Sequence, residues 1–132
     1  MTDAIAGVGT VFTRDSVAIA EIRNITGPGM TRDFIDVSNL DSTGGYREFI
    51  AGFRDGGELT FSMNFTIGGY DDLLLDYESE SVQSYELILP DSGTTTFSFS
   101  GFVTNLPLNI TPDDAVTVDV TIKISGQVSM AT

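Results

Sequence analysis

The sequence predicts a mainly β protein of the α+β class. In this fold two antiparallel β-sheets pack together as a sandwich or partial barrel, with one α-helix and a long loop. Gly, Thr and Ser are frequent among Val, Ile and Phe, which is typical of β proteins. Apolar and polar residues alternate clearly in residues 58–65 and 115–128, whereas only residues 70–79 have helical apolar spacing. At 132 residues, the chain is expected to form a single domain over residues 1–132.

The first third of the chain predicts an N-terminal arm followed by a hairpin. Residues 1–12 carry small apolar residues and glycines, so they are expected to form an arm or a short strand that becomes ordered on assembly. The β-branched residues of 17–25 predict a strand, and residues 30–37 predict a second one. Residues 26–29, Thr-Gly-Pro-Gly, are typical of a turn, so the two strands are expected to pair.

A long loop is expected over residues 38–55. It begins with turn-forming residues and then carries four large apolar side chains, Tyr46, Phe49, Ile50 and Phe53. Loops of this length in a compact domain are usually functional or disordered. Because these side chains are too apolar to remain free in water, we expect them to pack on this subunit or on a neighbour.

The rest of the chain predicts four strands and the helix. In the strand that follows Gly56-Gly57, residues Leu59, Phe61, Met63 and Phe65 form an apolar face, and Glu58 begins the polar one. The helix of residues 70–79 is expected to hold Asp71 and Asp72 in its first turn, near the positive end of the helix dipole. Three further strands are expected at residues 82–89, 94–106 and 115–128.

Composition excludes several kinds of chemistry. The chain has no Cys and no His, so disulfides, thiolate nucleophiles, histidine acid-base catalysis and common zinc sites are ruled out. Acidic pairs at Asp71-Asp72 and Asp113-Asp114 lack the spacing of a calcium loop and are explained by a helix start and a turn. We therefore expect no enzyme activity, no catalytic or metal-binding residues and no cofactor. No segment is apolar enough to predict a membrane span or a signal peptide.

Charge is distributed unevenly. The formal net charge is -13, and Lys123 is the only basic residue after position 54, among twelve acids in residues 55–132. Nucleic-acid binding requires a basic surface, so the chain is expected to repel DNA. Acidity of this kind often serves solubility alone. The arginine-bearing first part and the acidic second part can also meet between identical copies, and such head-to-tail contacts build rings or filaments.

One segment resembles a known family. Residues 46–57, Tyr-Arg-Glu-Phe-Ile-Ala-Gly-Phe-Arg-Asp-Gly-Gly, and the strand after them resemble the arginine, aromatic, glycine and Asp-Gly-Gly signature of tail tube proteins. These are the major tail proteins of long-tailed, non-contractile bacteriophages, the lambda-like siphoviruses. The strand at 97–103 and the final strand pattern with Ser125-Gly126 also resemble that family, so the resemblance covers nearly the whole chain.

The resemblance implies the tail-tube fold and a structural role in the virion. Subunits of this family form hexameric rings that stack helically into the tail tube, the channel for viral DNA ejection. The implied partners are other copies of the chain, the tape measure protein, the tail-tip or distal tail proteins and the tail terminator, while viral DNA passes without specific binding. Assembly is expected in the host bacterial cytoplasm. The end of the chain at Thr132 implies no appended immunoglobulin-like domain.

The resemblance also implies two sets of site residues. Residues 38–55 correspond to the family's ring-stacking loop, with candidate contacts at Arg47, Phe49, Phe53, Arg54 and Asp55. The candidate acidic residues facing the channel are Glu58, Glu86 and Asp119.

Two other functions remain open from the sequence. A tube subunit of a contractile injection or secretion system shares the architecture and the formation of rings. A monomeric acidic β-sandwich that binds carbohydrate or protein is the alternative of a different class. It requires an exposed aromatic platform, which is hard to find in a chain with no Trp.

Overall fold

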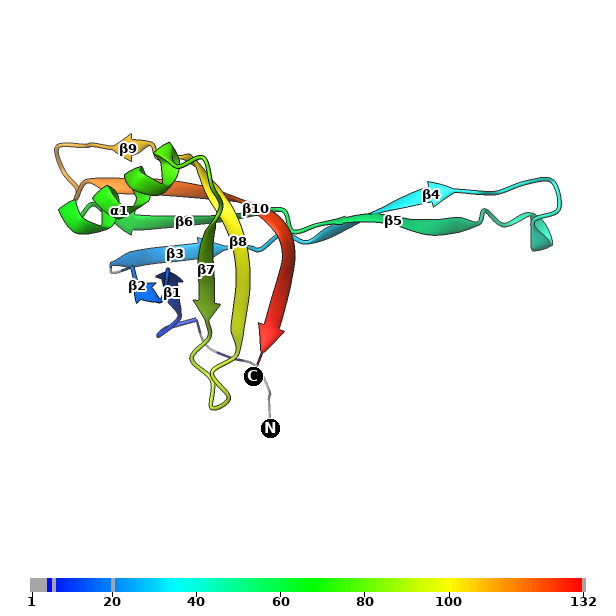
Figure 1. Ribbon diagram of the computed structural model, residues 1–132, viewed down its shortest axis with the longest axis horizontal. Coiled ribbons are helices and arrows are strands. Elements are labelled where there is room, and N and C mark those ends of the chain that lie inside the picture. Colours follow the sequence, from blue (N-terminus) through cyan, green and yellow to red (C-terminus); the bar gives the residue numbers. More distant parts are fainter. Residues whose placement is uncertain (1–4, 6, 20, 132) are drawn as a thin grey trace.

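The computed structural model describes residues 5, 7–19 and 21–131. It consists of a body and one long hairpin that projects from it (Figure 1). The body holds an eight-stranded antiparallel sheet, ordered β2-β1-β7-β8-β10-β6-β3 with β9 paired to β10. Its strands are β1 Val11–Arg14, β2 Val17–Ala18, β3 Ile22–Thr26, β6 Glu58–Asn64, β7 Gln83–Ile88, β8 Thr96–Asn105, β9 Leu108–Asn109 and β10 Thr117–Ala131.

The body sheet is strongly curled. Strands β1 and β6 are separated by β7, β8 and β10 in the sheet order, yet the ring centroids of Phe12 on β1 and Phe61 on β6 are 4.9 Å apart. The pairing of β10 with β8 shifts register between Thr121 and Ile122 and again before Ser129, and such irregularities bend a strand. The curled sheet therefore forms a half-barrel. The two layers that pack on one another are the two halves of this one sheet, and not two separate sheets. The predicted mainly β class with one helix is confirmed.

The core lies between the two halves of the sheet. The alternation predicted for β6 and β10 is confirmed, because Leu59, Phe61 and Met63 are buried together with the alternating apolar residues of β10. The buried cluster is Phe12, Leu59, Phe61, Met63, Leu73, Tyr85, Leu87, Phe99, Val103, Val118, Val120, Ile122 and Ile124. Phe65 lies just beyond β6, is 38% exposed, and packs on Tyr70 with ring centroids 5.3 Å apart.

Helix α1 spans Ile67–Glu78 and begins earlier than predicted. Thr66 is its N-cap, and the Thr66 Oγ1 accepts a hydrogen bond from the Gly69 backbone N–H at 3.2 Å. This cap allows the helix to start at Ile67 despite the two glycines that follow. Asp71 and Asp72 therefore lie outside the first turn, and their predicted role in capping was wrong. No helix in the described part of the chain has the length and apolar character needed for a membrane span.

The predicted pairing of strands 17–25 and 30–37 is wrong. The first region is divided into β2 and β3, and β3 pairs with β6 instead. The link through Gly27-Pro28-Gly29 does not reverse the chain but continues past the body into the long hairpin (Figure 1). The backbones of Gly29 and Gly57 are in close contact there, so this link is held against the start of β6.

The predicted loop 38–55 is also corrected. Strand β4, Thr31–Asp36, pairs with strand β5, Phe49–Asp55, as a separate two-stranded sheet. We call residues 31–55 the long hairpin; only 37–48 connect its strands, with a 3₁₀ turn at Thr43–Gly45. Of the four apolar residues that argued against a free loop, Phe49, Ile50 and Phe53 are residues of β5, whereas Tyr46 lies in the connection after the 3₁₀ turn.

The predicted N-terminal arm extended too far. Residues 1–4 and 6 lie outside the described part of the chain. Residues Val11 and Phe12 belong to β1, and Phe12 is fully buried. The reason is that Phe12 stacks on Tyr85 and also contacts Phe61, which makes it part of the core.

Candidate functional site

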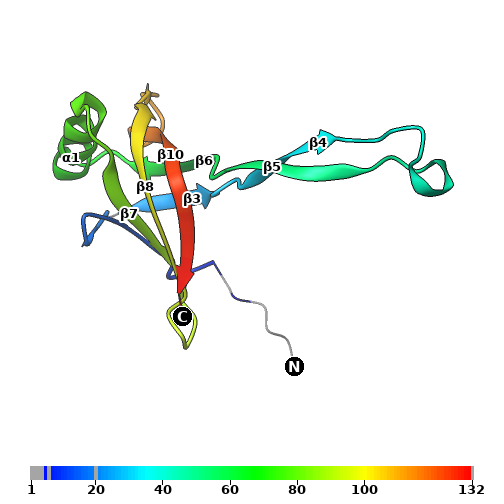
Figure 2. The same cartoon turned by 45° about the vertical axis from the view of Figure 1, so that its right-hand side comes forward.

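The long hairpin is the most unusual surface of the molecule. It projects from the body as a ribbon of only two strands (Figures 1 and 2). Isolated two-stranded hairpins are marginally stable in water. Large exposed apolar side chains occur along its length, at Phe34, Ile35, Val37, Leu40, Tyr46, Phe49, Ile50 and Phe53. Contiguous apolar surface of this kind marks an interaction site.

Both faces of the hairpin carry apolar side chains. Ile35 and Ile50 are directly opposite cross-strand partners, so they share one face. Phe34 and Phe49 contact each other edge to face, with ring centroids 5.1 Å apart. Phe53 is 89% exposed and contributes almost its whole ring to the surface. From the sequence, these side chains are expected to pack either on their own subunit or on a neighbour. The aromatic side chains of the hairpin are not packed against the body of their own subunit.

The tip of the hairpin is held by polar contacts. Arg47 Nη1 donates to Asp36 Oδ2 at 3.0 Å, and the Ser38 backbone N–H donates to Asp36 Oδ1 at 2.9 Å. The hydrogen bonds from Ser38, followed by that from Arg47, lower the pKa of Asp36. The Glu48 N–H donates to Ser38 Oγ at 2.6 Å. Arg47, a predicted contact residue, is therefore already paired within its own subunit.

The hairpin is anchored at its base by Asp55. The Asp55 carboxylate accepts hydrogen bonds from the Gly57 N–H at 2.8 Å and from Lys123 Nζ on β10 at 3.1 Å. These two contacts, the first being the stronger, lower the pKa of Asp55. The Ile124 N–H donates to the Gly57 carbonyl at 3.0 Å, which adds a second link to β10. Asp55 thus joins the hairpin to the body.

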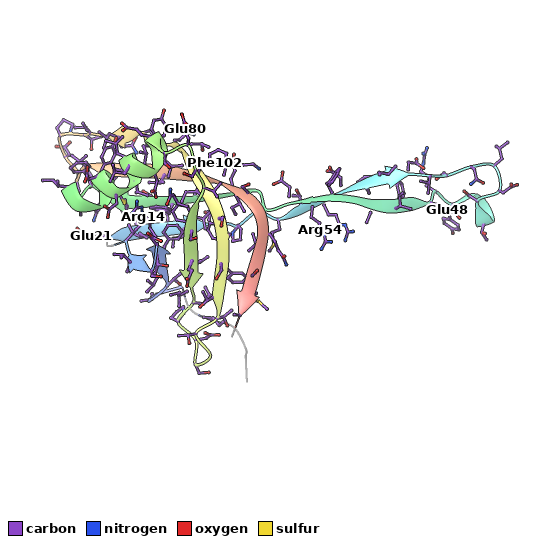
Figure 3. All side chains as sticks on the ribbon, in the orientation of Figure 1. Arg14, Glu21, Glu48, Arg54, Glu80 and Phe102 are labelled. Carbon is purple, nitrogen blue, oxygen red and sulfur yellow. The ribbon has the colours of Figure 1, made fainter. Side chains whose placement is uncertain are left out.

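A pocket of about 870 Å³ lies at the same base, between the hairpin and the second half of β10. Its walls include Arg32 and Arg54, which are cross-strand partners, together with Met30, Phe53 and Val128. Figure 3 shows Arg54 near the base of the hairpin and Glu48 near its far end.

The three acidic residues predicted to face a channel lie on one face of the body sheet. Glu58 precedes buried Leu59, Glu86 lies between buried Tyr85 and Leu87, and Asp119 lies between two buried valines. Because side chains alternate across a strand, all three point away from the core. Asp119 Oδ2 accepts a hydrogen bond from Asn109 Nδ2 at 2.8 Å. Between these acids the face carries Ser and Thr, including the paired Thr60 and Thr121, and it also carries Lys123, which lies opposite Glu58.

One buried polar network was not predicted. Arg14 on β1 donates from Nε and Nη2 to Asp76 on α1, at 2.6 and 2.7 Å, and the Tyr85 hydroxyl donates to Asp76 Oδ2 at 2.8 Å. Asp76 is only 1% exposed. Burial, and then the hydrogen bond to Asp76, raise the pKa of Tyr85 well above its ordinary value. The network attaches α1 to the sheet, and no spacing in the sequence indicated it.

The described residues contain no group of three acidic side chains arranged to hold a metal ion. The arrangement as a whole, an apolar projecting hairpin and a polar acidic sheet face, is suited to assembly with other protein chains.

Comparison with known proteins decides the family. The sequence model for the lambda phage tail tube protein matches residues 7–131. The chain belongs to the lambda phage tail tube protein family. The resemblance found in the sequence is therefore confirmed, and the protein is a structural subunit of a tail tube. This places it in the tail of a virion. None of the curated protein sequences compared with this tail tube protein matches it significantly.

Solved structures share the fold of this tail tube protein. A chain from the virion of a native gene transfer agent particle has 20% identity and a TM-score of 0.79, covering 98% of this chain and 100% of that one. A chain from the sheath-tube complex of an extracellular contractile injection system has 15% identity and a TM-score of 0.75, with 99% and 93% covered. A chain from the anti-feeding prophage cap has 15% identity and a TM-score of 0.76, with 100% and 93% covered.

Proposed function

We propose that this tail tube protein forms hexameric rings that stack helically, and that the stacked rings enclose the channel through which viral DNA is ejected. The observation that carries the proposal is the long hairpin, a two-stranded ribbon with apolar side chains on both faces in a member of a tube-forming family. A ribbon of this kind is stabilised when another subunit covers it. The role is structural, without enzyme activity.

The hairpin is proposed to make the contacts between rings. It projects beyond the body of its own subunit, so it can reach a subunit in the next ring (Figure 2). Phe49 and Phe53 supply apolar surface and Arg54 supplies charge, while Arg47 holds the tip in shape through Asp36. Asp55 acts from the base by anchoring the hairpin to Lys123.

The polar face that carries Glu58, Glu86 and Asp119 is proposed to line the channel. Carboxylates on that face repel the DNA phosphates, and the neutral hydroxyl groups do not attract them. DNA therefore passes without binding to the wall. The net charge of -13 supports this role.

A tube of defined length needs other proteins that set its length and close its two ends. We propose that the tube assembles in the host bacterial cytoplasm around a tape measure protein, from a tail-tip or distal tail complex to a tail terminator. The second candidate function is the tube of a contractile injection system. It is favoured by the similar fold of a chain from the sheath-tube complex of an extracellular contractile injection system.

Negative-stain electron microscopy of the purified protein tests the proposal, over a range of protein and salt concentrations, with and without tail-tip proteins. Stacked rings or tubes with an open channel are expected. Persistent monomers, even with tail-tip proteins present, would contradict the proposal. Co-expression with a sheath protein separates the two candidates, since only a tube of a contractile system recruits a sheath.

A further inference from the structure

Two arginines at the base of the long hairpin face each other without an acidic partner. Arg32 and Arg54 are directly opposite on β4 and β5, an arrangement in which like charges repel. Neither forms an ion pair within the described residues, whereas Arg14, Arg47 and Lys123 each do. The nearby Asp55 is already bonded to Lys123. This pair of cations is therefore available to carboxylates of another molecule.

The surroundings of the arginine pair are partly apolar, although Asp33 and Asp55 also line the same pocket. Arg32 and Arg54 line the pocket of about 870 Å³ together with Met30, Phe53 and Val128. Met30 and Phe53 are both largely exposed. A partner that fits this surface must offer acidic groups beside apolar side chains. We call Arg32, Arg54, Met30, Phe53 and Val128 the hairpin base.

Helix α1 presents a surface with that composition. Its exposed residues Ile67, Asp71, Leu75 and Glu78 follow one another at spacings of four, four and three, so they form one stripe. Ile67 is 82% exposed and Leu75 is 56% exposed, although both are large apolar residues. Asp71 and Glu78 form no ion pair within the described part of the chain. We call these four residues the helix stripe.

The two surfaces lie far apart within one subunit. Helix α1 is at one end of the long axis and the long hairpin projects from the other, in both views (Figures 1 and 2). Glu80, just after α1, lies on the body, whereas Arg54 lies on the hairpin beyond the other side of the body (Figure 3). The hairpin base and the helix stripe can therefore meet only between two copies of the chain.

We propose that the hairpin base of one subunit docks on the helix stripe of a second copy, with Arg32 and Arg54 against Asp71 and Glu78, and Phe53 against Leu75. This proposal rests on the proposed function and names the surface that receives the hairpin base. The contact joins two different surfaces, so each subunit offers one and accepts one. Such heterologous contacts propagate an assembly.

Cysteine cross-linking tests the contact directly, since the chain contains no Cys. The variants Phe53→Cys and Leu75→Cys are mixed under assembly conditions and oxidised. A disulfide-linked dimer is expected only in the mixture, because a disulfide requires Cα atoms within about 7 Å. A mixture of Phe53→Cys with Val17→Cys, an exposed site on β2, is the control. Assembly without the Phe53–Leu75 cross-link would overturn the proposed contact.

Charge reversal gives a second test that does not depend on cross-linking. Arg32→Glu with Arg54→Glu, or Asp71→Arg with Glu78→Arg, is expected to raise the protein concentration needed for half-assembly at least about tenfold, because like charges then meet. Combining all four changes is expected to restore much of the assembly. Asp113→Arg with Asp114→Arg makes the same charge change as the helix-stripe variant, but on an exposed loop, and should have little effect.

The outcomes separate the two proposals. If the wild-type protein forms tubes and neither reversal affects them, the docking contact is wrong and the tube function stands. If the wild-type protein never assembles, the proposed function itself fails, and the docking contact fails with it. Circular dichroism of each variant identifies any loss of fold.

Discussion

Arg14 and Asp76 form a bidentate ion pair that joins β1 to α1 across 62 positions of sequence, with Nε–Oδ2 at 2.6 Å and Nη2–Oδ1 at 2.7 Å. The Tyr85 hydroxyl adds a third hydrogen bond to the same carboxylate. Asp76 is buried, whereas Arg14 is partly exposed. The pair attaches the helix, and with it the helix stripe, to the body in a defined position.

Replacing Asp76 by Ala is expected to destabilise the protein by about 3 kcal/mol, because the change leaves a partly buried guanidinium without its partner. Tyr85→Phe removes one hydrogen bond and is expected to cost about 1 kcal/mol. Urea unfolding followed by circular dichroism measures both. Asp71→Ala, at an exposed site on the same helix, is the matched control and should change the free energy of unfolding by less than about 0.5 kcal/mol. Equal effects at positions 71 and 76 would contradict the structural role of the pair.

Gly57→Ala is expected to be strongly destabilising, by about 2 kcal/mol or more. Gly57 has a φ of +75°, and an added Cβ would collide with the backbone of Gly29. Gly126→Ala is the control, since Gly126 also has a positive φ, of +91°, but has open space around it. The difference in melting temperature between the two variants measures how closely the chain segments at Gly29 and Gly57 approach each other at this junction. If the two variants unfold alike, the junction is not tightly packed.

Asp91 is expected to make stability depend on pH. Its carboxylate accepts hydrogen bonds from the Thr95 hydroxyl and the Thr95 N–H, both at 2.7 Å, and these lower its pKa below the ordinary 3.8. A lowered folded-state pKa stabilises the fold above the unfolded value, and this stabilisation is lost as the pH falls through the folded pKa. Asp91→Asn should therefore lower the melting temperature at pH 7, and its difference from the wild type should shrink as the pH falls below 3.8 and through the folded-state pKa.

The control for Asp91 is Glu80→Gln, which makes the same change in net charge at an exposed site. This variant should not reproduce the pH-dependent difference. A constant offset between Asp91→Asn and the wild type at every pH would show that the carboxylate charge contributes nothing.

Reversing charge on the polar sheet face is expected to make assembled tubes retain DNA. Glu86→Lys with Asp119→Lys would introduce cations into the proposed channel wall, and phosphates bind cations in a salt-dependent way. Co-sedimentation of short DNA with preformed tubes measures retention, which should fall as salt rises. Asp113→Lys with Asp114→Lys is the matched control on an exposed loop. Equal retention in the two variants would argue against the polar face as the channel wall.

The sequence predicted local properties well. The alternation in β6 and β10 identified the buried face of each strand, because side chains in a strand point to opposite faces with a period of two. The existence of the helix followed from its apolar spacing, although its start at Ile67 depended on the Thr66 cap. The signature around Arg54 and Gly57 indicated the family.

The tertiary structure decided which elements meet. The Gly27-Pro28-Gly29 link had the composition of a turn, yet β3 pairs with β6 and β4 pairs with β5. The Arg14–Asp76 pair and the opposed Arg32 and Arg54 likewise arise only when distant segments come together. By itself, the sequence determined the strand faces, the helix and the family, because these depend on residues a few positions apart. Strand pairing and buried ion pairs depend on which distant segments pack together in the one core. Only the folded chain shows which pairings form.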